Sequence, residues 1–343
     1  MLSTALLALG GALAGALAML FGHGAWTRIF DRWSAPRLAR ARTALYEAPN
    51  VRQRGAELSA LRALPQKLQV RLLSEFARSP EGSDRFALAT LARETGLLRR
   101  AERMAHSRWW WRRLRGARQL TVFSADEILV LSLLRDPHPA VRAQAAELAA
   151  SHPTPAVVNA LLDGLEDCAA VCRFAVQDAL LRLGPVALPA LSSYLDRGNG
   201  TALAAALAVA EGMAEPVFAR AAVRLCDDHE PHVRERAVAL LGAIGGLDGV
   251  EAVRRRLDDA VAAVRAAAAR SLGQIGHWPA APAIAALLRD RSWEVRHAAG
   301  LALRDLGSPG LLLLRRSRAD GNIFAADMAR QVLDLPGAAG ARP

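Results

Sequence analysis

Few side chains in this sequence have the types and spacing that catalysis or metal binding requires. Cys168 and Cys172 lie four residues apart on an expected helix, where two thiolates could share one tetrahedral metal ion. No second Cys or His pair supplies the other ligands, and with Cys226 the three cysteines are too few for a disulfide framework. We expect small buried thiols in a reducing compartment, with no metal and no cofactor.

Motifs that mark common enzyme classes do not occur in the sequence. There is no Gly-rich phosphate loop, no His-Glu-x-x-His zinc motif and no serine nucleophile elbow. We therefore assign no catalytic residue and predict that the protein is not an enzyme.

The run from Arg108 to Arg115 carries the most concentrated binding chemistry, because it sets three indoles among four arginines. Three consecutive helical residues cannot all face one core, so at least one Trp should lie on the surface or in a groove. Contact with a membrane interface and contact with a protein both use this mixture. The alternative is that two indoles fill the first layer between helices and the arginines are solvated. The predicted partner-binding residues here are Trp109, Trp110, Trp111, Arg112, Arg113 and Arg115.

A motif that recurs at a fixed interval predicts the architecture. An Arg that follows Val or Cys, with an Asp six residues earlier, occurs five times, and these arginines are spaced 31, 61, 31 and 31 residues apart. Because 61 is two periods, a degenerate copy centred on Ala204 fills the gap. The five pairs are Asp136 and Arg142, Asp167 and Arg173, Asp228 and Arg234, Asp259 and Arg265, and Asp290 and Arg296.

Each copy contains two helices. Apolar residues after the Arg fall at helical spacing, as in Val264, Ala268 and Leu272, and a Gly-containing break follows. A second apolar stretch, such as Ala283 to Leu288, supplies an antiparallel partner. The sequence thus predicts an all-α fold, a right-handed α-solenoid of helix-turn-helix units about 31 residues long.

The pattern Asp-x4-Val-Arg-x2-Ala-x3-Leu-Gly resembles the short HEAT repeats of the phycobilisome-lyase-like type over residues 107 to 335. That repeat serves enzymes, scaffolds and adaptors alike, so the resemblance implies a fold rather than a function. Deoxyhypusine hydroxylase has similar repeats and binds two irons through several His-Glu pairs, whereas only His229-Glu230 exists here. No residue set for a linear tetrapyrrole is evident, and a lyase-like or nucleic-acid-binding module stays as the alternative function.

Residues at equivalent places in stacked repeats lie against each other, so an Asp of one repeat should meet an Arg of the next in a structural ladder. The degenerate copy over residues 197 to 213 lacks the pair and is a candidate bend or docking point. We expect the helices that carry the Val-Arg pairs to form the concave surface. On them Glu147, Asp178 and Arg270 occupy equivalent outward positions and are predicted partner contacts.

The amino terminus predicts a membrane anchor. Leu2 to Gly22 is free of charge and long enough to cross the bilayer, although Ala16-Leu17-Ala18 also resembles a signal-peptide cleavage site. No basic residue precedes this run and several arginines follow it, which orients the chain N-out with the solenoid in the cytoplasm, anchored once in the inner membrane. Gly11 and Gly15 form a small-xxx-small pair that favours close packing of transmembrane helices.

The net charge of +11 is local, because residues 23 to 118 hold 21 basic and 8 acidic side chains. Beside an anchor this excess favours anionic lipid headgroups, at residues 26 to 42, over nucleic acid. The predicted organisation is a transmembrane helix over 1–22, a basic helical region over 23–106 that caps the solenoid, the solenoid over 107–335 and a flexible tail over 336–343. We expect a membrane-tethered scaffold for a protein partner, with an envelope-biogenesis enzyme such as a glycosyltransferase as the narrower hypothesis.

Overall fold

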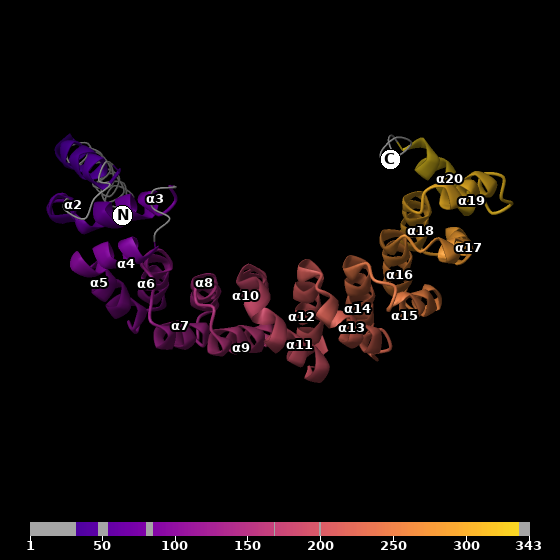
Figure 1. Ribbon diagram of the computed structural model, residues 1–343, viewed down its shortest axis with the longest axis horizontal. Coiled ribbons are helices and arrows are strands. Elements are labelled where there is room, and N and C mark those ends of the chain that lie inside the picture. The colour runs from indigo at the N-terminus through magenta and orange to yellow at the C-terminus, as the bar shows by residue number, and fades with distance from the viewer. Residues whose placement is uncertain (1–31, 47–53, 80–84, 168, 199, 336–343) are drawn as a thin grey trace, which may run out of the picture. The chain divides into compact units, whose positions relative to one another are not determined.

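The computed structural model describes residues 32–46, 54–79, 85–167, 169–198 and 200–335, and every regular element in these ranges is a helix (Figure 1). The predicted transmembrane segment with Gly11 and Gly15, Arg28, and the predicted tail lie outside the described residues. The all-α prediction is confirmed for the described chain.

The chain forms two compact units, Met1–Asp126 and Glu127–Pro343. The helix that follows the boundary predicted at 106/107 packs against the helix before it, and both lie in the first unit. The described helices of the first unit are a helix over residues 32–46, α2 (Arg54–Arg62), α3 (Gln66–Phe76), α4 (Arg85–Glu94), α5 (Leu97–Ala105) and α6 (Trp110–Phe123).

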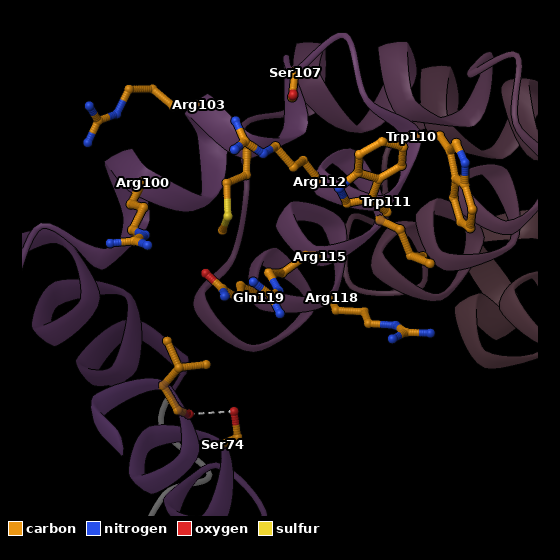
Figure 2. A pocket seen from close by; sticks show the side chains of 13 residues that line it. Ser74, Arg100, Arg103, Ser107, Trp110, Trp111, Arg112, Arg115, Arg118 and Gln119 are labelled. Atoms are coloured by element: carbon orange, nitrogen blue, oxygen red, sulfur yellow. Dashed lines mark hydrogen bonds between the residues drawn. The ribbon is translucent and has the colours of Figure 1, made fainter. Parts of the chain in front are cut away.

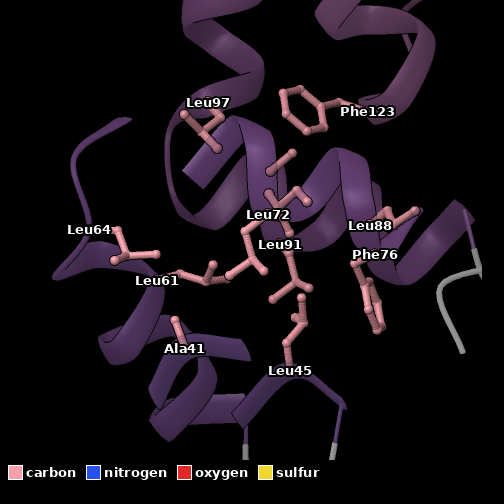
Figure 3. Close-up of a cluster of buried hydrophobic side chains, with 12 residues drawn as sticks. Ala41, Leu45, Leu61, Leu64, Leu72, Phe76, Leu88, Leu91, Leu97 and Phe123 are labelled. Atoms are coloured by element: carbon pink, nitrogen blue, oxygen red, sulfur yellow. The ribbon is translucent and has the colours of Figure 1, made fainter. Parts of the chain in front are cut away.

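Leucines at helical spacing build the core of the first unit (Figure 3). Leu61 of α2 and Leu72 of α3 are fully buried, and Leu97 of α5 and Phe123 of α6 close the same cluster. The helix over 32–46 joins it through an edge-to-face contact between the rings of Tyr46 and Phe76, whose centroids lie 5.1 Å apart. This core holds α3, α5 and α6 together and so positions the side chains on their outer faces.

The second unit consists of two rows of helices. The outer row is α7 (Glu127–Leu134), α9 (Pro155–Asp163), α11 (Leu188–Arg197), α13 (Ala219–Leu225), α15 (Val250–Arg255), α17 (Ala281–Ala286) and α19 (Ser308–Ser317). The inner row is α8 (Pro139–Ala149), α10 (Ala170–Leu183), α12 (Gly200–Met213), α14 (Pro231–Ile244), α16 (Ala262–Ile275) and α18 (Trp293–Asp305), and α20 (Ile323–Asp334) follows α19. Within this unit, Figure 1 shows the inner row on the inside of the curve.

The repeated Asp starts each Val-Arg helix. In every complete repeat the helix begins three residues after the Asp, and the carboxylate accepts a hydrogen bond from the backbone amide two residues on, as from Ser292 to Asp290 at 2.8 Å. Such a turn occupies an amide that the first turn of a helix leaves without a partner. The motif therefore marks helix starts, and the helices that carry it form the inner row.

One stretch among the described residues, Ala170–Arg197, has the length and composition of a membrane span. It is interrupted at Gly184, where φ is +56° and a 3-10 turn begins. α10 therefore lies in the inner row and α11 in the outer row, as in the other repeats. Of the 18 residues that form the most apolar part of this stretch, 33% are buried. We interpret this stretch as two helices of the solenoid.

Candidate functional site

The repeated Asp and Arg side chains join consecutive repeats of the second unit. Arg265 on α16 donates from Nε and Nη2 to the two carboxylate oxygens of Asp290, at 2.8 and 3.0 Å. The Arg of one repeat thus meets the Asp that starts the next Val-Arg helix, and both side chains of this pair are about nine-tenths buried. The same contact joins Arg142 to Asp167 and Arg234 to Asp259.

Each ladder arginine also binds its own repeat. Arg265 donates from Nη1 to the backbone oxygens of Asp259 and Ala260, at 2.8 and 3.1 Å. Burial acts to raise the pKa of Asp290, but the hydrogen bonds from Arg265 and from the Ser292 amide outweigh it and hold that pKa below its ordinary value. The Arg265–Asp290 pair is therefore ionised, and its charges join two consecutive repeats.

The ladder is interrupted on both sides of α12. Arg173 donates to the backbone oxygen of Asp167 at 2.6 Å, but no carboxylate of the described residues pairs with it across the repeat. Asp228 accepts from the Glu230 amide at 2.9 Å, and α12 has no arginine that would reach it. The degenerate copy therefore lacks both of its ladder links.

The exposed face of α10, next to this interruption, carries three large apolar side chains. Val171, Phe174 and Leu181 are exposed by 59, 74 and 41% and share a stripe with the exposed Asp178, at helical spacings of three and four. Asp178 was predicted from the sequence and the three apolar side chains were not, because helical spacing alone does not show which apolar stripe of a helix faces the core.

The other two predicted partner contacts, Glu147 and Arg270, are also exposed on the inner row. Glu147 of α8 accepts a hydrogen bond from Gln144 at 2.6 Å, and Asp178 lies 3.6 Å from Arg182. Arg270 of α16 is exposed. The three residues sit on separate helices of one surface, so they could contact a single extended partner but do not form a compact site.

The three indoles of the Trp run are all partly exposed, by 41, 40 and 49% for Trp109, Trp110 and Trp111. They pack on one another, with the ring centroids of Trp109 and Trp111 4.7 Å apart. The alternative in which two of them fill an interhelical layer is wrong, because the buried face of α6 is built from smaller residues and from Leu120 and Phe123.

A pocket of about 1210 Å³ opens beside this run within the first unit (Figure 2). The fold brings four of the predicted partner-binding residues to this pocket: Trp110, Trp111, Arg112 and Arg115. Arg113 does not line it, because its guanidinium donates to the backbone oxygens at the start of α6. The pocket also includes three arginines that the sequence analysis did not single out, Arg100, Arg103 and Arg118.

Close packing of α5 on α6 places these arginines around one hollow. A Cβ at Gly116 would lie 2.6 Å from the Ala105 nitrogen and 2.7 Å from the Ala101 oxygen, so the two backbones touch at this glycine. The same pocket is consequently lined by arginines of both helices, Arg100 and Arg103 of α5 and Arg112 and Arg115 of α6.

The predicted lipid contacts are only partly described. Trp33 is exposed by 52%, and the Arg37 guanidinium stacks 3.4 Å from the centre of its ring. Arg42 instead pairs with Glu75 at 2.6 Å. That arginine is therefore engaged inside the first unit.

Comparison with known proteins agrees with the geometry of the second unit. The family of HEAT repeats matches residues 250–323. The chain folds as a HEAT-repeat solenoid. It is similar to Kap95p in a structure with RanGDP, at 13% identity and a TM-score of 0.52, over 91% of this chain and 51% of that one. It is also similar to a Kap121p mutant, at 13% identity and a TM-score of 0.53, over 87% of this chain and 41% of that one.

A weaker likeness links the solenoid to the CpcE–CpcF complex of phycocyanin lyase from Nostoc sp. PCC7120. The identity is 22% over 62% of this chain and 94% of that one, and the TM-score of 0.38 is too low to support an argument. The sequence matches no curated protein. The likenesses to Kap95p and Kap121p establish the fold of this HEAT-repeat solenoid and do not establish its function.

The cysteines take no part in a site that the structure describes. Cys226 is buried, and its burial raises the thiol pKa to about 12. Cys172 is buried and donates from Sγ to the Pro139 backbone oxygen at 3.1 Å, while Cys168 lies outside the described residues. Among the described residues, no group of three or more His, Cys, Asp or Glu side chains could hold a metal ion.

Proposed function

We propose that the protein is a non-enzymatic scaffold that binds a protein partner through the inner row of its solenoid. The observation that carries this proposal is the exposed stripe of Val171, Phe174 and Leu181 on α10. A phenylalanine exposed by 74% gains about 1.5–3 kcal/mol when a partner buries it fully, which makes Phe174 the expected centre of the interface.

Charge around the stripe gives the interface its specificity. Asp178 lies within the stripe, and Glu147 and Arg270 extend the same surface along the inner row. A partner helix or loop with an apolar centre and a basic residue opposite Asp178 would satisfy both features. The interrupted ladder on both sides of α12 supports the same location, because a repeat with fewer links to its neighbours can adjust to a partner.

The fold supports a binding role. Kap95p, which shares the fold, is seen in solved structures with RanGDP and with Nup1. The solenoid described here spans about half the length of that chain, so the proposal covers binding of a protein and not the identity of the partner.

The tether and the narrower partner are further parts of the proposal. The uncharged segment from Leu2 to Gly22, followed by arginines, supports a single inner-membrane anchor with the solenoid in the cytoplasm. An anchored scaffold meets membrane-bound partners preferentially, because both are confined to one surface. A membrane-bound enzyme of envelope biogenesis, such as a glycosyltransferase, is the partner class that we propose on this ground.

The decisive experiment is site-directed photo-cross-linking in membranes that contain the full chain. A photoreactive residue at position 174 should capture one protein, and the same residue at Leu247, which is exposed by 72% outside the inner row, should not. Phe174→Glu should abolish capture in pull-downs while Leu247→Glu retains it. Equal capture by the two variants would contradict the assigned surface.

A second comparison tests the tether. The full chain should sediment with membranes after a high-salt wash, and a chain without residues 1–22 should not. Recovery of the same partner as a soluble complex from both chains would contradict the membrane-bound partner class while leaving the binding surface intact.

A further inference from the structure

The pocket of the first unit has an unbalanced charge. Its lining includes five arginines and no carboxylate, and these arginines come from α5 and α6: Arg100, Arg103, Arg112, Arg115 and Arg118. All five are exposed, and none forms an ion pair with a carboxylate of the described residues. In the second unit, by contrast, arginines such as Arg265 meet a carboxylate.

Such a cluster repels itself, since five guanidinium groups around one hollow have no counter-charge from the protein. A bound anion would relieve that repulsion and would receive charge-assisted hydrogen bonds from several sides. Guanidinium groups are planar donors that match the oxygens of phosphate two at a time. Arginines from two helices can donate to one anion from several directions. A phosphate group has more oxygens to accept these bonds than a single carboxylate has.

The aromatic side of the pocket extends the chemistry. Trp110 and Trp111 line the pocket together with Arg112, and Figure 2 shows the two indoles close together on the side away from Arg100 and Arg103. Val70, Met104 and Leu114 add apolar surface, and Ser74, Ser107 and Gln119 add neutral polar groups. A ligand that carries phosphate on a ring or on a hydrocarbon would therefore meet complementary surface at both ends.

We propose that this pocket binds a small phosphate-bearing ligand, with the phosphate held by Arg112, Arg115 and Arg100 and the remainder packed against Trp110 and Trp111. A cavity of about 1210 Å³ has the size of a small-molecule site, slightly above the usual range. Nucleic acid is disfavoured, because the net charge outside residues 23 to 118 is −2 and provides no basic track along the solenoid. The site lies in the first unit and is independent of the partner surface on α10.

Calorimetric titration of the full chain in a neutral detergent tests this proposal. Two probes separate the possible sources of the phosphate, sodium pyrophosphate for a soluble ligand and dihexanoyl phosphatidic acid for a lipid headgroup. The pocket variant is Arg112→Gln with Arg115→Gln. The matched control is Arg93→Gln with Arg99→Gln, two exposed arginines of the same unit that do not line the pocket, so both variants lose the same charge.

We expect saturable binding of at least one probe, weakened about tenfold or more in the pocket variant and less than about twofold in the control. Binding of pyrophosphate, with or without phosphatidic acid, assigns a soluble phosphate ligand, and binding of phosphatidic acid alone assigns a lipid headgroup. Unchanged thermal unfolding shows that the pocket variant is folded. The proposal is overturned if neither probe binds or if both variants weaken binding equally.

Discussion

Replacing Arg265 with methionine tests whether the ladder stabilises the solenoid in the way that its geometry indicates. The substitution keeps most of the side-chain volume but removes two hydrogen bonds to Asp290 and two to backbone oxygens. The Asp290 side chain is 9% exposed and would be left as a buried charge whose remaining donor is the Ser292 amide.

Breaking a buried ion pair from one side costs about 3–5 kcal/mol, and we expect the lower end because the pair lies near the surface. The loss should be local, since each repeat of a solenoid contacts mainly its neighbours. Urea unfolding followed by circular dichroism measures the total. Hydrogen exchange should show faster opening of α16 and α18 than of the earlier inner-row helices.

Two companion variants test whether the loss of stability comes from the unpaired Asp290 carboxylate. Arg254→Met breaks a surface pair with Glu251 and should leave stability unchanged. Adding Asp290→Asn to Arg265→Met removes the stranded charge and keeps an acceptor for the Ser292 amide, so the double variant should be more stable than the single one. A double variant that is less stable by the sum of both effects would refute the role assigned to the unpaired carboxylate.

Three further outcomes follow from the structure. Hydrogen bonding from Arg142 holds the pKa of Asp167 below its ordinary value. The Arg142–Asp167 pair should therefore stabilise the fold fully above about pH 4, and this contribution should disappear as the pH falls through the lowered pKa. A free energy of unfolding that stays constant down to about pH 2 would contradict this. Gly116→Ala should cost about 1–3 kcal/mol in thermal unfolding, because its Cβ meets the α5 backbone, whereas Gly321→Ala has open space and should cost little. Cys226, with its pKa raised to about 12 by burial, should resist alkylation at neutral pH until urea unfolds the chain.

Some parts of the site could be predicted from single residues and others could not. The Trp run was identifiable because three adjacent indoles cannot share one buried face, and the structure exposes all three. Arg100 and Arg118 gave no comparable signal, because exposed arginines are common on helices and the sequence does not show which helix faces which. Phe174 was missed for a related reason, since an apolar residue at helical spacing is usually assigned to the core.

The fold of the second unit was determined by the sequence alone, because a motif repeated about every 31 residues forces each unit to bury its apolar face against an identical neighbour. The tertiary structure decided the rest. It joined Arg142, Arg234 and Arg265 to the Asp of the following repeat, it brought α5 and α6 together at Gly116 to form the pocket, and it left the α10 stripe uncovered. These features depend on which side chains of packed helices meet, even where the helices are consecutive as α5 and α6 are, and periodicity carries no information about such contacts.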